Sequence, residues 1–363
     1  MTRLPPPRVI RAVTRLRTAI QSLDRRMVPP EVGLLELASG FMATHAIYAA
    51  AKLGIADTLV DGPLPAQDIA SRIGSDPDAT HRLLRACATF GVFTEKPDGQ
   101  FDLTPLALGL RSGTPDSMVP VILMLGHPDY QRPWGHLAET VHTGMPAAET
   151  VFGKPMWEHL DENPEFGATF ANAMTRLSAL DWPTVSAVYD FTPYATIIDI
   201  GGGQGQLLAS ILAAAPSAKG VLLEREVVLE AAEEHLREAG VLARCRIEGG
   251  SFFDTVPSDG DLYLMRRVIH DFDDDRAAAI LTNVRRQMPA DATLLLLESV
   301  VPPGNTPHFA KMLDLDMMIF VGGRERTERQ FDTLLDRAGF RRRRVIPTAS
   351  ALSLIEAVVG TRP

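Results

Sequence analysis

Apolar and polar positions follow two different periods along the chain, and the period changes near residue 181. From residue 34 to about residue 181, apolar residues recur at helical spacing between Pro and Gly breaks, and no strand pattern is long enough to suggest a sheet of its own. After residue 181, short apolar runs alternate with helical segments, as in a parallel sheet covered on both faces. The sequence therefore predicts a mostly α half followed by an α/β half.

The second half is predicted to be a doubly wound α/β domain. Its strand-like runs are residues 196–200, 220–223, 244–248, 262–265 and 294–297. The helices between them are expected at residues 206–215, 227–239 and 274–288. In such a sheet, a ligand binds beyond the carboxyl ends of the strands, where the first strand turns into the first helix.

The first half contains the outline of a winged helix. Residues 65–74 and 78–90 are expected to form two helices separated by a turn, and acidic residues suit the start of the second. Residues 92–94 and 101–103 flank a polar Pro97-Asp98-Gly99 turn, which is typical of a β-hairpin. A helix, a turn, a second helix and a hairpin make this outline.

A winged helix often binds DNA through its second helix, which here carries His81, Arg82 and Arg85. Acidic residues outnumber the single Lys96 around them: Asp76, Asp78, Glu95, Asp98 and Asp102. The whole chain of 363 residues has a formal net charge of −9. Because nucleic-acid binding depends on Lys and Arg that neutralise phosphates, the charge balance favours a small organic substrate over nucleic acid.

Residues 1–30 are rich in Arg and Pro and are expected to form a basic N-terminal arm. Apolar residues recur there at helical spacing, which predicts an amphipathic helix: Val9, Val13, Leu16, Ile20 and Leu23. Such a helix can attach to an anionic membrane surface or pack on a dimer partner. We favour packing on a partner, because basic amphipathic helices are common and unspecific.

Two further observations bear on the cellular compartment. No apolar run appears long enough to span a bilayer, and the start lacks the apolar block of a signal peptide. The two cysteines, Cys87 and Cys245, are far apart and form neither a disulfide framework nor a paired thiolate metal motif. We therefore expect a cytoplasmic protein with no stable membrane association.

The strongest chemical signal is the glycine-rich segment at residues 199–205, Asp-Ile-Gly-Gly-Gly-Gln-Gly. Glycine lets a backbone bend sharply and approach a ligand closely, although a tight turn without a ligand has a similar sequence. Dinucleotide-binding turns usually have the spacing Gly-x-Gly-x-x-Gly, which differs from this one. S-adenosylmethionine has no pyrophosphate and carries an α-amino group, which the Asp199 carboxylate can receive.

Two later segments support a nucleoside ligand. Glu224 closes the second strand about twenty residues beyond the turn, where a carboxylate can accept both ribose hydroxyls. After the third strand, Ser251 offers a hydroxyl near the adenine edge, and Phe252 offers an aromatic face for stacking. Each residue alone would more often be an ordinary surface or core residue.

The chain resembles the two-domain O-methyltransferases that include plant caffeate enzymes and bacterial polyketide enzymes. The resemblance covers nearly the whole chain and rests on four motifs, at residues 199–203, 249–253, 266–272 and 322–327. It implies a Rossmann-like, doubly wound S-adenosylmethionine domain (residues 181–363) preceded by a mostly α, winged-helix-like domain for dimerisation and the acceptor pocket (residues 31–180). It also implies a homodimer.

The resemblance further implies which residues bind the cofactor: Gly201, Glu224, Ser251, Phe252 and Arg266, with Ser178 a weaker candidate. Two of them depart from the family pattern, which usually has Asp at the position of Ser251 and often Lys at that of Arg266. Ser251 can still form a hydrogen bond but carries no charge, and Arg266 cannot release a proton as Lys can.

The resemblance places the catalytic base at His270, with Glu298 and Glu325 orienting its ring. Imidazole titrates near neutral pH, so it suits removal of a proton from a phenol or similar hydroxyl. The expected products are S-adenosylhomocysteine and a methylated small molecule, and no metal is expected. We interpret the acidic run after His270 as a loop and the first turn of a helix, not as Mg²⁺ ligands: Asp271, Asp273, Asp274 and Asp275.

The acceptor itself is not predicted beyond a small hydroxylated aromatic or polyketide-like molecule. His127, His136 and Met174 lie in the helical segment that forms the roof of the acceptor pocket in this family. Two other functions stay open: an S-adenosylmethionine-binding homologue that catalyses a reaction such as hydroxylation, and a non-enzymatic winged-helix protein that binds a ligand or DNA. His270, Glu298 and Glu325 argue against the first.

Overall fold

The computed structural model describes residues 13, 16, 20, 23 and 27–360. These residues form two compact units, and each unit is built from segments that are not contiguous in the sequence. One unit comprises the described residues between 16 and 132 together with residues 164–176, and the other comprises residue 13 and residues 133–163 and 177–360. Most of the predicted N-terminal helix, including Val9, lies outside the described residues.

The first unit is mostly helical and contains the predicted winged helix. Its helices are α2 (Pro30–Ala38), α3 (Gly40–Lys52), α4 (Ile55–Thr58), α5 (Ala66–Ile73), α6 (Pro77–Thr89), α7 (Val119–Leu125) and α8 (Pro128–Trp134), with a 3₁₀ turn η1 (Ala107–Leu110). Strands β2 (Phe93–Glu95) and β3 (Gln100–Leu103) form the hairpin, and β1 (Leu64–Pro65) pairs antiparallel with β3. The hairpin prediction is confirmed, but the expectation of no sheet in this half is wrong by one short strand, because two residues show no periodicity.

Local sequence explains where α6 begins. Asp76 precedes the helix, and its side chain accepts a hydrogen bond from the backbone N–H of Ala79 at 2.8 Å. Pro77 occupies the first turn, where its missing N–H costs nothing. Leu84 and Cys87 of α6 pack with Ile55, Ile69 and other buried residues in the core of this unit.

Helices α2 and α3 leave apolar side chains exposed. Together they span residues Pro30–Lys52, a stretch of 23 residues long and apolar enough to cross a membrane by length and composition alone. The expectation that no run reaches this length is therefore wrong. Leu34, Leu35 and Phe41 are 57–70% exposed, as are the described N-terminal residues Val13 and Leu16, at about 60%.

The second unit contains a seven-stranded sheet. Its parallel strands are β4 (Thr196–Ile200), β5 (Lys219–Glu224), β6 (Cys245–Gly249), β7 (Leu262–Arg266) and β8 (Thr293–Ser299). Strands β9 (Phe340–Pro347) and β10 (Leu352–Val359) are antiparallel, and the strand order is β6-β5-β4-β7-β8-β10-β9. The doubly wound prediction is confirmed, and all five predicted strands lie within two residues of their expected bounds.

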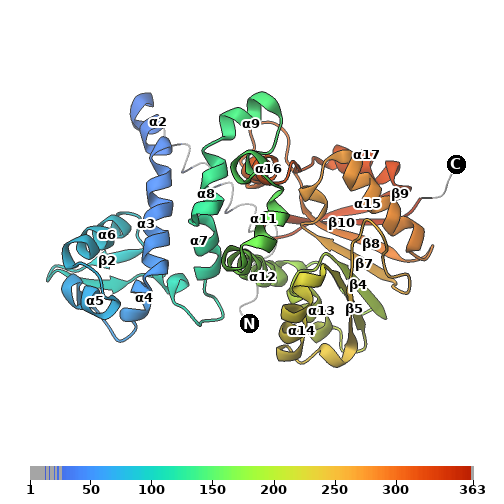
Figure 1. Cartoon of the computed structure of the whole chain (residues 1–363), viewed down its shortest axis with the longest axis horizontal. Coiled ribbons are helices and arrows are strands. Elements are labelled where there is room, and N and C mark those ends of the chain that lie inside the picture. Colours follow the sequence, from blue (N-terminus) through green and yellow to red (C-terminus); the bar gives the residue numbers. More distant parts are fainter. Residues whose placement is uncertain (1–12, 14–15, 17–19, 21–22, 24–26, 361–363) are drawn as a thin grey trace. The chain divides into compact units, whose positions relative to one another are not determined.

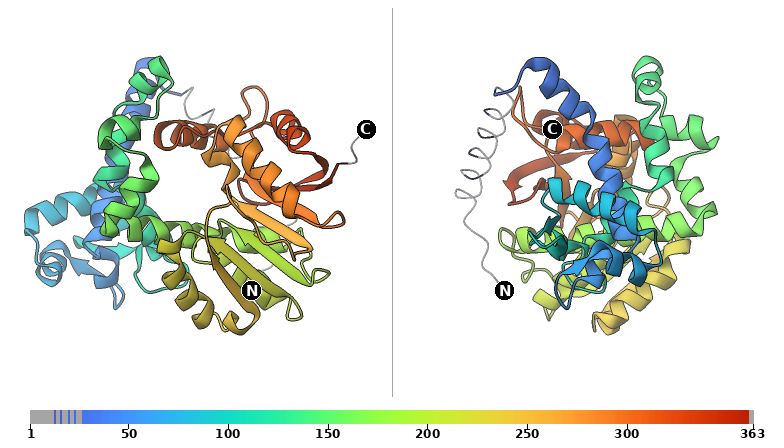
Figure 2. Two further views of the ribbon diagram at one scale, coloured as in Figure 1. Left: turned by 45° about the vertical axis from the view of Figure 1, so that its right-hand side comes forward. Right: turned by 90° about the vertical axis from the view of Figure 1, so that its left-hand side faces the viewer.

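Helices cover both faces of this sheet (Figure 1). They are α13 (Gln206–Ala214), α14 (Leu229–Glu238), α15 (Asp274–Gln287) and α17 (Glu328–Arg337). The same unit also contains α9 (Leu137–Thr143), α10 (Ala147–Phe152), α11 (Met156–Glu162) and α16 (Ala310–Phe320). Helix α12 (Pro164–Ser186) contributes its second half. The left view of Figure 2 shows the parallel strands side by side between helices.

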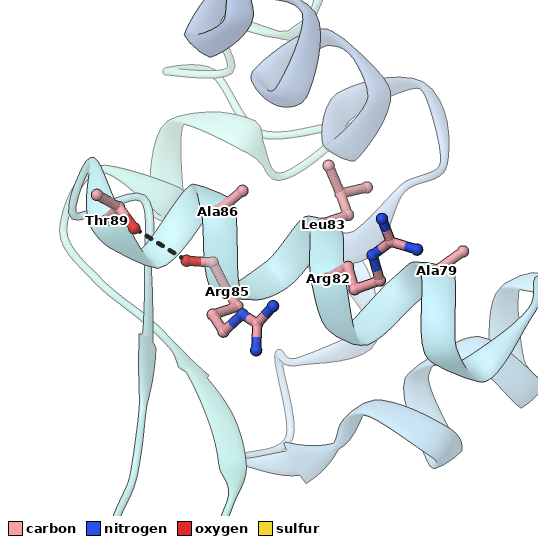
Figure 3. A pocket seen from close by; sticks show the side chains of 6 residues that line it. All are labelled: Ala79, Arg82, Leu83, Arg85, Ala86 and Thr89. Carbon is pink, nitrogen blue, oxygen red and sulfur yellow. Dashed lines mark hydrogen bonds between the residues drawn. The ribbon is translucent and has the colours of Figure 1, made fainter.

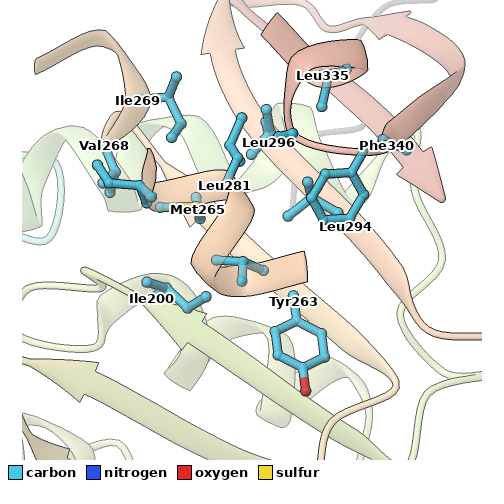
Figure 4. Packing of buried hydrophobic residues seen from close by; sticks show 14 of the residues in the cluster. Ile200, Tyr263, Met265, Val268, Ile269, Leu281, Leu294, Leu296, Leu335 and Phe340 are labelled. Atoms are coloured by element: carbon cyan, nitrogen blue, oxygen red, sulfur yellow. The ribbon is translucent and has the colours of Figure 1, made fainter. Parts of the chain in front are cut away.

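Alternation along the strands builds two separate cores. Leu294 and Leu296 of β8 point to the face that α15 and α17 cover, and Leu295 and Leu297 point to the face of α13 and α14. Figure 4 shows the first of these cores, in which Leu281 of α15 lies over Met265 of β7. Both faces of the strands are buried, so the carboxyl ends of β4, β5 and β7 are held rigidly for the site described next.

Candidate active site

The glycine turn follows β4 and has no room for side chains at Gly201 and Gly202. The backbone N–H of Gly201 donates to the carbonyl of Leu223 at 2.8 Å, which joins the turn to β5. Gly201 has a φ of +68°, and a Cβ at this position would lie 2.9 Å from Val268 Cγ2. A Cβ at Gly202 would lie 2.5 Å from Asp199 Oδ2. The turn therefore presents bare backbone to a ligand.

Asp199 lies beneath this turn as an unsatisfied buried carboxylate. Its side chain is fully buried, and neither oxygen has a hydrogen-bond partner among the described residues. Burial raises the pKa of Asp199 to about 7, although the nearby Arg266 guanidinium opposes the rise. A buried acceptor without a donor is costly, so this group fits the amino group of S-adenosylmethionine.

Glu224, at the end of β5, braces the same turn. One carboxylate oxygen accepts the N–H of Gly203 at 2.9 Å, and the other accepts the N–H of Arg225 at 2.8 Å. The structure thus brings Glu224 to the glycine turn, as expected for a ribose-binding residue. Each carboxylate oxygen has a further lone pair for a ligand hydroxyl.

The predicted adenine side lies on the segment after β6. The Phe252 ring is next to the turn, since a Cβ at Gly201 would lie 3.5 Å from its Cε1 atom. The Phe252 carbonyl accepts a hydrogen bond from Asn283 at 2.8 Å, which fixes the backbone below the ring. Ser251 Oγ accepts the N–H of Phe253 at 3.2 Å. Gly201, Glu224 and Phe252 therefore converge, with Ser251 beside them.

Arg266, the remaining predicted cofactor residue, closes β7. Its guanidinium is mostly buried and donates to the Asp181 carboxylate of α12 at 2.7 Å. The neighbouring Arg267 lies 3.7 Å from the same carboxylate and has a φ of +52°, which is unusual for a residue with a side chain. Sequence reasoning missed Asp181, because it lies in the middle of a long helix without a motif.

His270 lies in the 3₁₀ turn η4 (Ile269–Asp271) directly after β7. Its ring is 6% exposed, and Nδ1 lies 2.7 Å from Glu325 Oε1 and 3.9 Å from Glu298 Oε2. Glu298 Oε1 accepts the backbone N–H groups of Val268 and Ile269, so β8 holds the turn. The three predicted catalytic residues thus come together from β7, β8 and the segment before α17.

Asp271 also faces the imidazole, with Oδ1 at 3.4 Å from Nε2. It is therefore part of the histidine site, whereas the sequence placed it only in a loop before a helix. The rest of that interpretation is confirmed: Asp273 caps α15 by accepting the N–H groups of Asp275 and Arg276. Asp314 was missed altogether; it accepts the backbone N–H of Glu325 at 2.8 Å.

Burial governs the electrostatics around His270. It raises the pKa of Glu325 to about 8 and that of Asp271 to about 7, and it also raises the pKa of Glu298. The positive charge of Arg267 opposes the rise at all three carboxyls. Burial therefore favours the neutral form of the three carboxyls that surround the His270 ring.

The donor atoms of His270, Glu298 and Glu325 lie within 4.8 Å of one another, a spacing that a metal ion would also accept. In the structure, the shortest contact in the group is the one between Nδ1 and Glu325, at 2.7 Å. All three residues are at most 6% exposed. The arrangement is that of a histidine oriented by carboxylates.

The weaker candidates are placed as follows. Ser178 is buried in α12, and His127 stacks on Phe166 with ring centroids 4.5 Å apart. His136 is exposed and lies 3.2 Å from Glu139.

A surface hollow of about 530 Å³ lies along α6, whose residues are far from the glycine turn in the sequence. Figure 3 shows the residues that line it: Ala79, Arg82, Leu83, Arg85, Ala86 and Thr89. They all belong to one helix, and Arg82 forms an exposed ion pair with Asp78 at 3.7 Å. These contacts give no support to DNA binding by the winged helix.

Comparison with known proteins agrees with the geometry. A model of the O-methyltransferase domain matches residues 134–341, and a model of the O-methyltransferase dimerisation domain matches residues 35–110. The phenazine O-methyltransferase PhzM of Lysobacter antibioticus is 44% identical over 91% of this chain and 96% of its own. The 8-amino-8-demethylriboflavin N,N-dimethyltransferase of Streptomyces davaonensis is 37% identical over 85% and 90%.

A solved structure carries the cofactor product. The methyltransferase CalO1 of calicheamicin biosynthesis, in its S-adenosylhomocysteine-bound form, is 34% identical and superposes with a TM-score of 0.81 over 91% of this chain and 98% of its own. The O-methyltransferase NcsB1 of neocarzinostatin biosynthesis, which is 30% identical with a TM-score of 0.75 over 87% of this chain and 95% of its own, was solved in complex with S-adenosylmethionine. The chain therefore belongs to the family of S-adenosylmethionine-dependent O-methyltransferases.

Proposed function

We propose that this enzyme methylates a hydroxyl oxygen of a small aromatic acceptor, with His270 as the general base. The observation that carries the proposal is the 2.7 Å contact between His270 Nδ1 and the buried Glu325 carboxyl. An Nδ1–H that donates to Glu325 fixes the tautomer in which Nε2 is free of a proton. That nitrogen is then able to accept the proton of the acceptor hydroxyl.

The residues that would hold the cofactor are those around the glycine turn. Bare backbone at Gly201 and Gly202 allows the cofactor to approach closely. The amino group of the cofactor would donate hydrogen bonds to the Asp199 oxygens, which have no donor among the described residues. Glu224 would bind the ribose hydroxyls, and Phe252 with Ser251 would contact the adenine. Arg266 contributes through Asp181 and through its charge beside Asp199.

S-adenosylmethionine supplies a methyl group on a sulfonium centre, which the acceptor oxygen takes as the carbon–sulfur bond breaks. His270 removes the hydroxyl proton, which makes the oxygen a better nucleophile. Glu325 stabilises the imidazolium that results, and Glu298 holds the turn through the N–H groups of Val268 and Ile269. Rate depends on close placement of the reacting atoms, so a rigid turn matters.

The names of the relatives support a class of acceptor. The phenazine enzyme is named for O-methylation of a fused aromatic ring system, and it covers 91% of this chain. We therefore propose a planar aromatic or polyketide-like hydroxyl compound. Membership of an enzyme family also leaves no support for the non-enzymatic interpretation.

The direct test incubates the purified enzyme with labelled S-adenosylmethionine and a panel of hydroxylated aromatics that includes hydroxyphenazines. We expect a product that is heavier by one CH₂ and carries the label on oxygen, as read by mass spectrometry and NMR. A product that gains oxygen or loses CO₂ would instead support the hydroxylation or decarboxylation alternative. Turnover of none of these compounds, with cofactor bound, would argue against a phenolic acceptor.

A second candidate is transfer to nitrogen, which the riboflavin relative's name supports. Matched pairs of acceptors that differ only by hydroxyl or amino group separate the two reactions. A neutral amine attacks without prior loss of a proton, so His270→Ala should lower its rate much less than that of the phenol. Equal losses with both acceptors would contradict the general-base assignment.

A further inference from the structure

One buried cation of the segment before α17 has no role in the reaction described so far. The Arg326 side chain is completely buried, which is rare for a charged group unless its hydrogen bonds are satisfied. Its Nε donates to Asp274 Oδ1 at 2.9 Å. The two remaining guanidinium nitrogens point at backbone carbonyls, and these belong to the turn that carries His270.

The contacts enclose that turn from both ends. One terminal nitrogen donates to the carbonyl of Ile269 at 2.9 Å, and the other donates to the carbonyl of Phe272 at 2.8 Å. Between them, the carbonyl of His270 accepts the backbone N–H of Arg324 at 2.8 Å. Three of the four carbonyls from Ile269 to Phe272 are therefore held by the segment of Arg324 and Arg326.

The main chain of Arg326 makes a second connection. Its carbonyl accepts the N–H of Val301 at 3.0 Å, and Val300 forms a parallel bridge with Arg326 just beyond the end of β8. Glu298 lies on that strand, and Glu325 is the neighbour of Arg326 in sequence. The side chain of Arg326 thus reaches the histidine turn, while its backbone is fixed to the carriers of both glutamates.

Close packing leaves this arrangement little freedom. A Cβ at Gly323 would lie 2.0 Å from the carbonyl oxygen of His270, so the two backbones are already in contact. The planar guanidinium can satisfy two carbonyls and a carboxylate at once, whereas a lysine ammonium concentrates its donors at one point. The number and direction of the bonds require arginine and not simply a positive charge.

From these contacts we infer that Arg326 is a positioning residue, which fixes the orientation of the His270 ring between Glu298 and Glu325. This inference rests on the proposed function of His270. The Arg326 side chain is completely buried, and it acts by holding the carbonyls on either side of the histidine. Displacement of the turn would lengthen the Nδ1 contact to Glu325 and misdirect Nε2.

The test compares Arg326→Lys with Arg337→Lys. Arg337 is a matched control, because it lies on α17 and pairs with Asp275 at 2.7 Å on the exposed surface. For Arg326→Lys we expect kcat on a confirmed acceptor to fall about tenfold to a hundredfold, with KM for S-adenosylmethionine nearly unchanged. Arg337→Lys should change neither. A folded Arg326→Lys enzyme with a normal kcat would overturn the inference.

A spectroscopic readout separates this inference from the proposed function. A proton shared by His270 Nδ1 and Glu325 gives a low-field proton NMR signal, which His270→Asn identifies by its loss. We expect Arg326→Lys to shift this signal or broaden it through faster solvent exchange, even if no acceptor is ever found. If His270→Ala lowers kcat but the pH–rate profile with the acceptor shows no limb, His270 is not the general base. If the NMR signal still responds to Arg326→Lys in that case, the positioning role of Arg326 stands.

Two more measurements keep the inference open to contradiction. If Arg326→Lys does not fold, Asp274→Asn is the alternative variant, because it removes the charge of the half-exposed carboxylate that binds the Arg326 guanidinium. This variant should change the NMR signal in the same direction as Arg326→Lys, but by less. An unchanged signal and unchanged kcat in Asp274→Asn would then overturn the inference. In a His270→Ala background, Arg326→Lys should cause no further loss; an additive loss would contradict action through His270.

Discussion

Buried charge is concentrated around one imidazole, that of His270. Three carboxyls with raised pKa values, Asp271, Glu298 and Glu325, lie around it, and the cations of Arg267 and Arg326 limit the rise at Glu325. Such a group of coupled acids is expected where protons are moved, because their protonated and ionised forms are close in energy. The chemistry of the proposed reaction therefore depends on His270 and the few charged side chains around it.

We expect His270→Ala to lower kcat for a phenolic acceptor by about a hundredfold or more, because the hydroxyl loses its positioned base. His142→Ala is the matched control, since His142 is an exposed histidine on α9. The measurement is steady-state turnover with S-adenosylmethionine at saturation. Turnover of His270→Ala within a few fold of the parent enzyme would remove the base role and leave the family assignment intact.

Asp199 gives a prediction about pH. Its pKa is raised from 3.8 to about 7 in the folded state, so the folded protein binds a proton there that the unfolded chain releases. Stability of the cofactor-free enzyme therefore falls as pH rises through that window. Asp199→Asn removes the buried charge, and we expect it to raise Tm at about pH 8 by more than at about pH 5.

The same substitution should weaken S-adenosylmethionine binding, because the amide carries no charge for the ligand's amino group. Calorimetric unfolding at both pH values and titration with the cofactor give the two readouts. The sequence alone suggested only that Asp199 meets this amino group. The structure adds that both Asp199 oxygens are buried without hydrogen-bond partners among the described residues, which destabilises the cofactor-free enzyme. A Tm difference that is independent of pH would contradict the raised pKa.

At the scale of elements, the glycine turn depends on two backbones that meet without side chains between them. We expect Gly202→Ala to destabilise the enzyme by about 1–3 kcal/mol, because its Cβ would lie 2.6 Å from Leu222 Cδ1 as well as against Asp199. Gly109→Ala is the control: its Cβ would lie 3.8 Å from Met118 Cγ, an ordinary contact. Urea unfolding compares the two.

Affinity for S-adenosylmethionine should fall in Gly202→Ala and stay unchanged in Gly109→Ala. The reason is displacement of the bare backbone that the ligand approaches. If Gly202→Ala binds the cofactor as tightly as the parent enzyme, the turn has more freedom than its packing indicates. Isothermal titration at a single temperature suffices for this comparison.

The strands of the sheet show which parts of the fold can be predicted from the sequence. Strands β4, β5, β7 and β8 are mostly apolar runs whose residues are buried on both faces, and such runs are recognisable without tertiary information. Their carboxyl ends meet at one edge, so residues that follow them, such as Glu224 and His270, were predictable as neighbours. Strand β10 was not, because it inserts antiparallel between β8 and β9, which precedes it in the chain.

The missed site residues share one cause. Asp181 and Asp314 lie within helices, where an acidic residue has the appearance of ordinary surface polarity. Their partners, Arg266 and the N–H of Glu325, are 85 and 11 residues away in sequence. Only the packed structure brings them together. Domain spans 31–180 and 181–363 stay predictions, since the compact units divide the chain differently and no finding tests those limits.

At the scale of the whole molecule, the apolar stretch of α2 and α3 needs a cover. Large exposed apolar surfaces on a soluble enzyme mark interaction sites, and residues 35–110 match the dimerisation domain of this family. We therefore propose that a second copy of the chain packs on the exposed side chains of this stretch: Leu34, Leu35, Leu37, Phe41 and Met42. A membrane is the competing cover, because the length of 23 residues satisfies it too.

A double substitution, Leu34→Glu with Leu35→Glu, separates these two covers. We expect the parent enzyme to sediment as a dimer and the variant to sediment as a monomer, because two charges per chain would be buried without partners at the interface. Val141→Glu, at an equally exposed apolar residue of α9, should stay dimeric. Neither protein should bind lipid vesicles. A monomeric parent that binds vesicles through this stretch, and loses that binding in the double variant, would show that the stretch serves a membrane. A dimer that survives the double variant would place the interface elsewhere on the chain.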